Sequence, residues 1–199
     1  PNHEEIIKQD FLKLDKKFDD THIIGNPPFG RQSSLAKKFI KKVSSAKSIS
    51  FILPKSFKKE SLKKTFPLDF HLIHENDLPF NSFKVNGDDY DVPCIFQIWV
   101  KKSYDREVLE KEEPCKFKFV KKEDEHDISF RRVGVYSGEI NSETETKSPS
   151  SHYFIKFLDN DLLDKIEQFK TIDFPKDNTV GARSISKPEL IREFNKIIK

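Results

Sequence analysis

A chain of 199 residues is long enough for one sizeable domain, or for a domain with a small appendage. Its 36 basic and 33 acidic side chains leave a formal net charge of only +3, so overall charge does not by itself predict nucleic-acid binding. The sequence has no signal peptide, no bilayer-length apolar run and no metal-type spacing of its two cysteines. We therefore expect a soluble protein with reduced thiols and no metal, cytoplasmic or, in a eukaryote, nuclear.

The first hundred residues alternate between segments typical of strands and segments typical of helices. Short apolar runs that end at a turn predict strands, and amphipathic runs with lysines on one face predict helices. This order predicts an α/β layer with a mostly parallel sheet. Strands are expected at 4–11, 20–25, 48–53, 70–75 and 91–102, with helices after a cap at Ser33 or Ser34 and over about 56–64.

The last two expected strands have no helix between them. Residues 76–90 lie there instead, and a loop of that length inside a compact domain is often functional. After Lys102 the composition changes, so we expect one domain over 1–102 and a smaller α+β region over 103–199. In that region, strands are expected within 115–122, 128–138 and 151–157, and helices over 161–169 and after a capping box at 186–189.

Residues 23–30 read IIGNPPFG and contain more turn-forming residues than a surface loop needs. Each proline fixes its own φ and restricts the residue before it, so Asn26 and Pro27 are expected to be extended. Because Pro28 has no amide hydrogen, the Pro27 carbonyl is expected to point outward as an acceptor beside the Asn26 side-chain oxygen. Phe29 adds a flat apolar face. This set suits a planar base with an exocyclic amino group.

An adenine amino nitrogen is a poor nucleophile because its lone pair is delocalised into the ring. Two acceptors bonded to its hydrogens favour a more pyramidal nitrogen and stabilise the positive charge that develops during methyl transfer. The NPPF stretch after an apolar strand resembles the catalytic motif of the S-adenosylmethionine-dependent adenine-N6 DNA methyltransferases. The resemblance implies that the Asn26 side chain and the Pro27 carbonyl hold the amino group and that Phe29 stacks on a flipped-out adenine, with Pro28 as the fourth residue of the catalytic motif.

Upstream and downstream segments resemble the same family in the same order. IIKQDFL at 6–12 resembles the end of the third strand, which implies that Asp10 contacts the cofactor's adenine and that Phe11 packs on its ring. The expected strand at 48–53, with its run into Leu-Pro, resembles the next core strand. Residues 77–83 and 90–99 resemble the loop and strand pair whose aromatic residue covers the other face of the target base, which implies Phe83 for that role or, second, Phe80.

The basic residues gather locally, with ten lysines between residues 37 and 64. Such a patch attracts a polyanion or forms a solvated surface, and the sequence leaves both open. The region after residue 102 lies where the family subgroup with a C-terminal recognition domain has that domain, which favours DNA as the partner. Expected nucleic-acid contacts are Lys55, Lys58, Lys59, Arg131, Arg132, Arg183 and Lys187.

The chain departs from the family at the cofactor. Its six glycines form no G-x-G pair and none precedes Asp10, which only nine residues precede. We therefore expect the C-terminal half of a Rossmann-like methyltransferase sheet with an incomplete site for S-adenosylmethionine. A missing N-terminal half or a complementary chain would complete that site. The start at Pro1 and the absence of Met favour a fragment over a split or degenerate enzyme.

Two other functions stay open. The first is a catalytically silent nucleic-acid-binding module derived from such an enzyme. The second keeps the methyl-transfer chemistry and replaces DNA with RNA or with a glutamine side chain, because a similar tetrapeptide serves planar amides.

Overall fold

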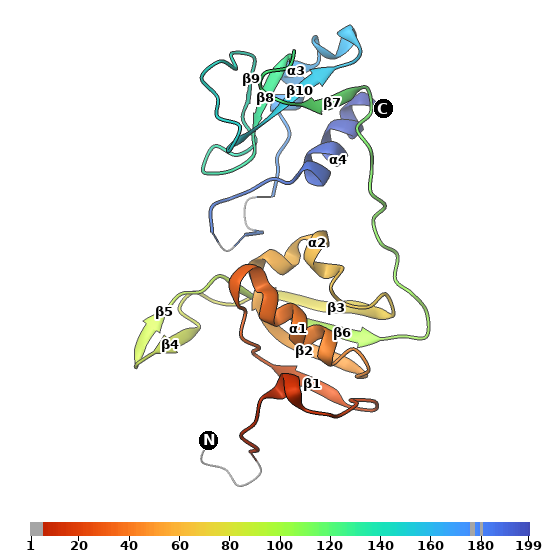
Figure 1. Cartoon of the computed structure of the whole chain (residues 1–199), viewed down its shortest axis with the longest axis vertical. Coiled ribbons are helices and arrows are strands. Elements are labelled where there is room, and N and C mark those ends of the chain that lie inside the picture. Colours follow the sequence, from red (N-terminus) through yellow and green to blue (C-terminus); the bar gives the residue numbers. More distant parts are fainter. Residues whose placement is uncertain (1–5, 176–177, 180) are drawn as a thin grey trace. The chain divides into compact units, whose positions relative to one another are not determined.

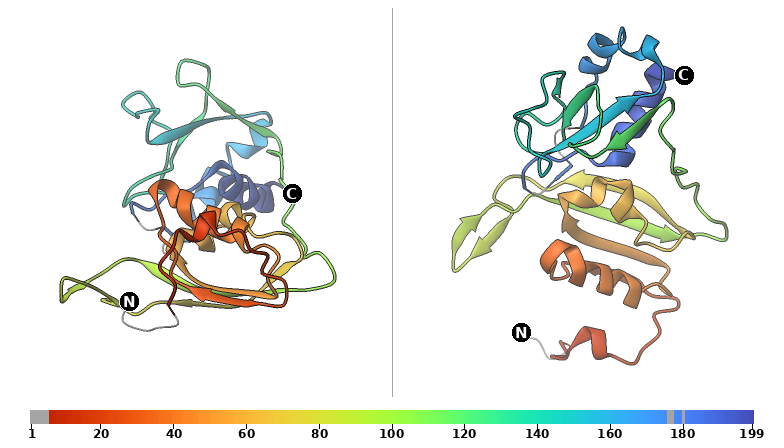
Figure 2. Two further views of the ribbon diagram at one scale, coloured as in Figure 1. Left: turned by 60° about the horizontal axis from the view of Figure 1, so that its bottom comes forward. Right: turned by 45° about the horizontal axis from the view of Figure 1, so that its top comes forward.

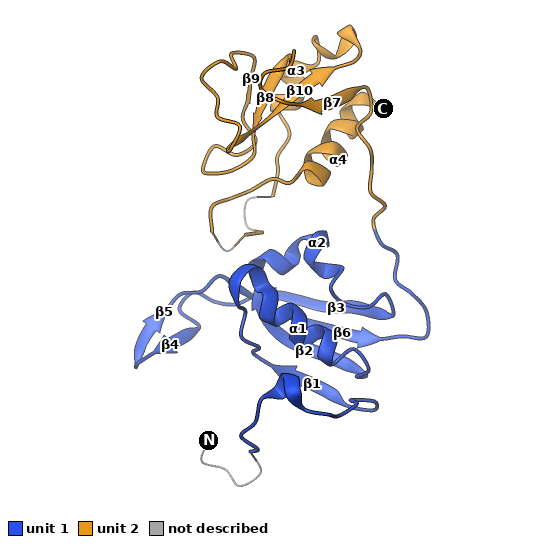
Figure 3. Ribbon diagram, viewed as in Figure 1, with its two compact units in different colours: residues 1–108 blue, residues 109–199 orange. Residues whose placement is uncertain are grey.

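The computed structural model describes residues 6–175, 178–179 and 181–199. The chain divides into two compact units, residues 1–108 and residues 109–199 (Figure 3). Each unit has its own sheet and its own apolar core, and the fold is mixed α/β. Within the described ranges, no helix has both the length and the apolar character needed to cross a bilayer.

The sheet of unit 1 has four strands, in the order β1 (His22–Gly25), β2 (Ser48–Pro54), β6 (Cys94–Lys101) and β3 (Phe70–Asp77). β1 and β2 are parallel and are joined through helix α1 (Ser34–Lys42), a strand–helix–strand unit typical of Rossmann-like sheets. β6 is antiparallel to both of its neighbours. The expected mostly parallel sheet is therefore correct only in part. Strands β1, β2 and β3 run in the same direction, but β6 lies between β2 and β3 and is antiparallel to both. A parallel pair needs a crossover connection, and no helix connects β3 to β6.

Helices α1 and α2 (Glu60–Lys63) lie on the same side of this sheet (Figures 1 and 2). α1 directs Ala36 and Ile40 into the core, while its lysines form the opposite face. Aromatic rings fill much of the remaining core, and Phe66 stacks on Trp99 with ring centroids 4.1 Å apart. The strands expected at 20–25, 48–53, 70–75 and 91–102 and the helix after Ser33 are confirmed.

Two expected elements of unit 1 are wrong. Residues 6–9 have no regular structure and precede a 3-10 turn (Phe11–Lys13), while residues 4 and 5 lie outside the described residues. The helix expected over 56–64 is interrupted at Lys59, whose ψ of 136° is extended. A 3-10 turn (Lys55–Lys58) and the single turn of α2 take its place.

The segment expected to be one long loop contains a β-hairpin instead, formed by β4 (Phe83–Val85) and β5 (Asp88–Tyr90). Asn86 and Gly87 connect the two strands with φ values of 53° and 94°. Positive φ at both positions is the signature of a type I′ turn, whose twist matches that of the flanking strands. The hairpin extends away from the four-stranded sheet (Figure 1).

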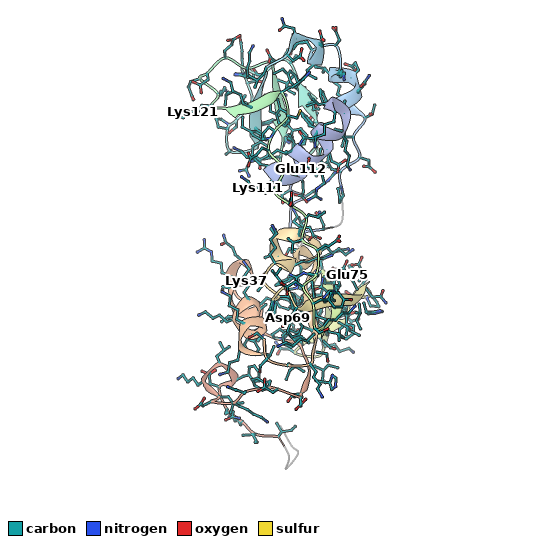
Figure 4. The ribbon with its side chains drawn as sticks, turned by 90° about the vertical axis from the view of Figure 1, so that its right-hand side faces the viewer. Lys37, Asp69, Glu75, Lys111, Glu112 and Lys121 are labelled. Carbon is teal, nitrogen blue, oxygen red and sulfur yellow. The ribbon has the colours of Figure 1, made fainter. Side chains whose placement is uncertain are left out.

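The buried Gln97 side chain of unit 1 has its hydrogen-bond partners inside the core. The fully buried amide of Gln97 donates to Glu75 at 2.6 Å and accepts from the Trp99 indole at 3.0 Å; Figure 4 labels Glu75. Lys63 lies 3.5 Å from the same Glu75 carboxylate. Because Lys63 belongs to α2 and Glu75 and Gln97 belong to the sheet, this network holds α2 against the sheet. Leaving one of these polar groups without a partner would be costly at low dielectric.

Arg106 closes the other end of α2. Its guanidinium lies 5.2 Å from the Trp99 ring centroid and donates to four backbone carbonyls, those of residues 63, 66, 67 and 70. These carbonyls belong to the helix end and to the turn that leads into β3, where intrahelical partners run out. A cation at a helix C-terminus also interacts favourably with the helix dipole.

Unit 2 is an antiparallel sheet in the order β7 (Phe117–Val120), β10 (His152–Phe157), β8 (Ile128–Arg131) and β9 (Ile140–Asn141). Helices α3 (Ile166–Lys170) and α4 (Lys187–Ile198) complete its core. The capping box expected at Ser186 and Glu189 is present at the start of α4. The helix expected over 161–169 is split, since a 3-10 turn (Asn160–Leu162) precedes α3.

We expect Arg106→Ala to lower the free energy of unfolding of unit 1 by about 3 kcal/mol, because it leaves several buried carbonyls without a donor. Arg106→Lys should recover only part of the loss, since an ammonium cannot reach four carbonyls as a planar guanidinium does. Urea unfolding followed by tryptophan fluorescence measures this, because Trp99 is the chain's one tryptophan.

The matched control is Lys111→Ala, which removes a cation from an exposed ion pair with Glu113. We expect a change of less than about 1 kcal/mol there. Equal effects of the Arg106→Ala and Lys111→Ala substitutions would show that the Arg106 contacts do not stabilise the unit.

Candidate functional site

The acceptor turn, which we define as Asn26, Pro27, Pro28 and Phe29, follows directly after β1 at the carboxyl end of that strand. In open α/β sheets, this end is where ligands bind. Asn26 and Pro28 are exposed, Pro27 is buried and Phe29 is half-buried. The turn therefore presents its amide to solvent while its first proline ring anchors it.

The backbone of the acceptor turn is held by α1. The Phe29 carbonyl accepts hydrogen bonds from the amides of Leu35 at 3.1 Å and Ala36 at 3.3 Å. These amides belong to the first turn of α1, where a capping side chain usually satisfies them. The cap expected from a Ser33 or Ser34 side chain is absent at Ser33, whose φ is 60°. A carbonyl of the turn takes that place, so the turn and the helix hold each other.

Gly30 makes this close approach sterically allowed. Its φ is +68°, and a Cβ there would lie 2.8 Å from Leu35 Cγ and 2.9 Å from Ser34 Oγ. Gln32 and Ser33 also have positive φ, at 51° and 60°. Such conformations cost on the order of 1–3 kcal/mol each outside glycine, and they gather at functional sites. The chain thus accepts local strain next to the acceptor turn.

The acceptor turn and the β4–β5 hairpin together line one open cavity of about 440 Å³, the turn cavity. All four residues of the acceptor turn line it, and Phe83 of β4 joins them. The structure thus brings together the expected catalytic motif and the first choice for the second stacking ring. Phe80, the second choice, is 77% exposed and is not among the lining residues.

Sequence reasoning missed Lys84, Val85, Tyr90 and Val92, which also line the turn cavity. They reach it only because the segment folds back on itself as a hairpin. The Asn86-Gly87 pair between two short β-prone stretches was the available signal, since this dipeptide is the strongest short-range indicator of a two-residue hairpin turn.

Among the described residues, none donates a hydrogen bond to the Asn26 side chain or to the Pro27 carbonyl. Both residues line the turn cavity, where Asn26 is exposed and Pro27 is buried. Acceptors at such a position suit a ligand with N–H groups.

The residues expected to bind the cofactor serve structural contacts. The Asp10 carboxylate accepts from the Leu12 amide at 3.0 Å and caps the first 3-10 turn, and Lys13 lies 4.0 Å from it. Phe11 stacks on Phe39 with centroids 5.1 Å apart, which covers one face of its ring. Neither Asp10 nor Phe11 lines the turn cavity.

The expected phosphate contacts of unit 1 are partly neutralised. Lys55 and Lys58 lie 3.3 Å and 2.9 Å from the Asp77 carboxylate. Burial raises the pKa of Asp77, but hydrogen bonds and charge from Lys58 and Lys55 outweigh it and hold that pKa below its usual value. Lys59 is half-buried at the start of α2.

The arginines of unit 2 bind the backbone. Arg131 donates to the Val133 carbonyl at 3.3 Å, and Arg132 donates to the Ser150 carbonyl at 2.8 Å. Arg183 donates to the Phe174 carbonyl at 2.6 Å. Each guanidinium retains further N–H groups, so a role in binding phosphate stays a prediction for these residues.

Both cysteines are free thiols, and Cys94 is buried. Burial, and then the neighbouring Asp91 carboxylate, raise the pKa of the Cys94 thiol to about 11. A thiol with that pKa stays protonated and unreactive at neutral pH. In the part of the chain that the structure describes, no group of three His, Cys, Asp or Glu side chains is arranged to hold a metal ion.

No known family model and no curated protein matches this chain. Among solved structures, it is similar to the crystal structure of a "putative RNA methyltransferase" from Pyrococcus horikoshii, at 17% identity and a TM-score of 0.33. The similarity covers 46% of this chain and 48% of that one, so the chain matches about half of that protein's length. At this level the likeness carries no conclusion about function.

We expect Gly30→Ala to destabilise unit 1 by about 2–3 kcal/mol, because the new Cβ meets both the positive φ and two contacts under 3.0 Å. Two matched substitutions separate these causes. Gly87 has φ +94° with no described atom within 4 Å of a Cβ, so Gly87→Ala should cost about 1 kcal/mol. Gly181 has neither feature, and its substitution by Ala should be neutral. Thermal unfolding of the three variants would contradict this reading if all lost equal stability.

Cys94 should resist iodoacetamide at pH 8 in the folded chain, since a pKa of about 11 leaves almost no thiolate. Its alkylation rate should rise as pH approaches 11 or when urea unfolds unit 1. Peptide mass spectrometry after timed alkylation gives the rate. Rapid modification of Cys94 at pH 8 without unfolding would show that the thiol is not buried.

Proposed function

We propose that this chain carries the target-base half of an adenine-N6 DNA methyltransferase that uses S-adenosylmethionine. The observation that supports this most is the pair of unpartnered acceptors, Asn26 and the Pro27 carbonyl, in a cavity that Phe29 and Phe83 also line. An exocyclic amino group is the ligand with two N–H donors on a flat ring. In this proposal the target adenine leaves the duplex to reach the cavity, because its amino group is paired inside the stack.

The acceptor turn would bind and orient the amino group. The Asn26 side-chain oxygen and the Pro27 carbonyl each accept one N–H, which directs the nitrogen lone pair away from both. Pro28 contributes by restricting the backbone of Pro27, which keeps the Pro27 carbonyl in a fixed direction. Because the Phe29 carbonyl is bonded to α1, these acceptors are already placed before the base arrives. Preorganised dipoles aimed at developing charge supply much of enzymatic rate enhancement.

Phe29 and Phe83 would hold the plane of the base from the turn side and from the hairpin side. Stacking on an aromatic side chain contributes ~1–3 kcal/mol per base. Tyr90 and Val85 extend the apolar lining of the hairpin side. A base bound between these apolar walls would displace water from the acceptors, which strengthens their hydrogen bonds to the amino group.

The described residues do not fit a complete site for the methyl donor. Asp10 caps its own turn, Phe11 is covered by Phe39, and the sequence offers no glycine-rich loop. S-adenosylmethionine supplies the electrophilic methyl group when it is bound. In this proposal its site is completed by a further segment or a partner chain, and this chain by itself only binds and orients the base.

The missing donor contacts favour a second function, a catalytically silent nucleic-acid-binding module. Such a module would bind DNA with an affinity that falls steeply with added salt and would not bind S-adenosylmethionine at any stage. Methylation assays on DNA, RNA and a glutamine peptide, with the donor half present, separate the enzyme from this module and separate the three substrates.

We expect Asn26→Ala to lower kcat by about 10²–10³-fold in the complete assembly, since one charge-stabilising partner is removed. DNA affinity should change by less than about threefold, because stacking and phosphate contacts are retained. Methyl transfer from radiolabelled S-adenosylmethionine and fluorescence anisotropy with labelled DNA measure the two quantities.

The control is Asn76→Ala, which removes an exposed amide on β3 that does not line the turn cavity. It should leave both quantities unchanged. An equal loss of turnover and affinity in the Asn26→Ala variant would refute the assigned role.

A further inference from the structure

Unit 2 has a hollow of its own, with a volume of about 210 Å³. It lies at the ends of β7 and β10 and the start of α4. This volume is below the ~300–1,000 Å³ of typical small-molecule sites, so the hollow suits one planar group rather than a whole cofactor. The lining residues that matter are Phe119, Lys121, Lys122, His152, Tyr153 and Lys187.

The hollow combines an aromatic pair with a lysine that lies over it. Phe119 and Tyr153 meet edge to face at 5.5 Å, and Lys187 Nζ lies 4.4 Å from the first ring centroid and 5.7 Å from the second. Lys187 is the first residue of α4, where the helix dipole disfavours a positive charge. None of the described carboxylates forms an ion pair with it, and its contacts are with the two rings.

Positive charge dominates the lining of the hollow. Three lysines line it against one acidic residue, Glu123. Lys121 is exposed (Figure 4), and Lys122 Nζ donates to the Glu145 carbonyl at 2.6 Å. Arg132 lies over Tyr153 at 5.5 Å and adds a further cation beside the aromatic pair. Cations interleaved with aromatic rings are the pattern that binds the phosphates and bases of a nucleic-acid strand.

His152 also lines the hollow, and the protein itself holds its ring. The side chain is 6% exposed, and its Nδ1 lies 3.0 Å from Ser151 Oγ and 3.1 Å from the Ser148 carbonyl. Its Nε2 is buried and has no hydrogen-bond partner among the described residues. Burial lowers the pKa of His152. His152 therefore forms part of the wall of the hollow and is not assigned a ligand contact.

We propose that this hollow binds one nucleotide of a nucleic-acid strand. Its base packs against Phe119 and Tyr153. Lys187 exchanges its ring contacts for a phosphate of the same strand, with Lys121 and Lys122 beside it. The inference rests on the proposed nucleic-acid substrate and not on the methyl-transfer step, because all of its residues belong to unit 2.

The test is fluorescence anisotropy of the full chain with a labelled single-stranded oligonucleotide and with an abasic strand of equal length and charge. We expect the base-containing strand to bind about tenfold more tightly than the abasic strand, since stacking requires a base. Lys187→Ala should weaken binding of the base-containing strand about tenfold.

The matched control is Lys196→Ala, on the same helix and with the same change in charge. Lys196 pairs with Glu193 at 2.7 Å and does not line the hollow, so its loss should weaken binding less than about twofold. Equal affinity for the two strands, or equal effects of the two substitutions, would overturn the proposal in favour of purely electrostatic contact.

An assembly that binds through this hollow yet transfers no methyl group would contradict the proposed function and leave this site standing, whereas active methyl transfer with no base preference at the hollow would do the reverse.

Discussion

Unit 1 depends on the pair of hydrogen bonds from the amides of Leu35 and Ala36 to the Phe29 carbonyl. A helix needs acceptors for its first amides, and here they come from the acceptor turn rather than from a capping side chain. The bonds therefore stabilise α1 and immobilise Phe29 at once. Because Pro27 and Pro28 fix the backbone immediately before Phe29, rigidity extends back to Asn26. This arrangement requires glycine at position 30, since a Cβ there would clash with Ser34 and Leu35 of α1.

Several charged side chains of unit 1 also serve structural contacts. The core of unit 1 uses Arg106 and Lys63 to satisfy backbone carbonyls and the Glu75 carboxylate, and Asp77 holds Lys55 and Lys58. A cation count along the sequence therefore overstates the charge available to a polyanion. Unit 2 differs at its hollow, where the charge of Lys187 lies over aromatic rings instead of against a carboxylate. Cations of this kind are released to a phosphate at lower cost than members of a buried ion pair.

The sequence was most informative where local chemistry is self-contained. Apolar runs located β2, β3 and β6, and the capping box located α4, because burial and capping act over a few residues. Asn26 to Phe29 could be singled out as a candidate site for the same reason. The pairing of the strands could not be predicted, since no feature of the β6 sequence indicates that this strand lies between β2 and β3. Phe83 reached the turn cavity as expected, but Tyr90 and Lys84 were missed because the Asn86-Gly87 turn, and not the residues themselves, places them there.

The turn cavity and the hollow differ in how their side chains meet a ligand. An acceptor that is left unpaired when water is excluded costs about 1–3 kcal/mol. Asn26 is exposed at the open turn cavity, so that cost arises only when an incoming group displaces water without donating a hydrogen bond. This requirement acts at the moment of binding and favours a ligand with N–H groups. At the hollow, Lys187 already contacts two aromatic rings, so a strand bound there gains only the difference between a phosphate contact and those ring contacts. Discrimination at the turn cavity thus comes from the acceptors, whereas at the hollow it comes from the base that replaces Lys187 over the rings.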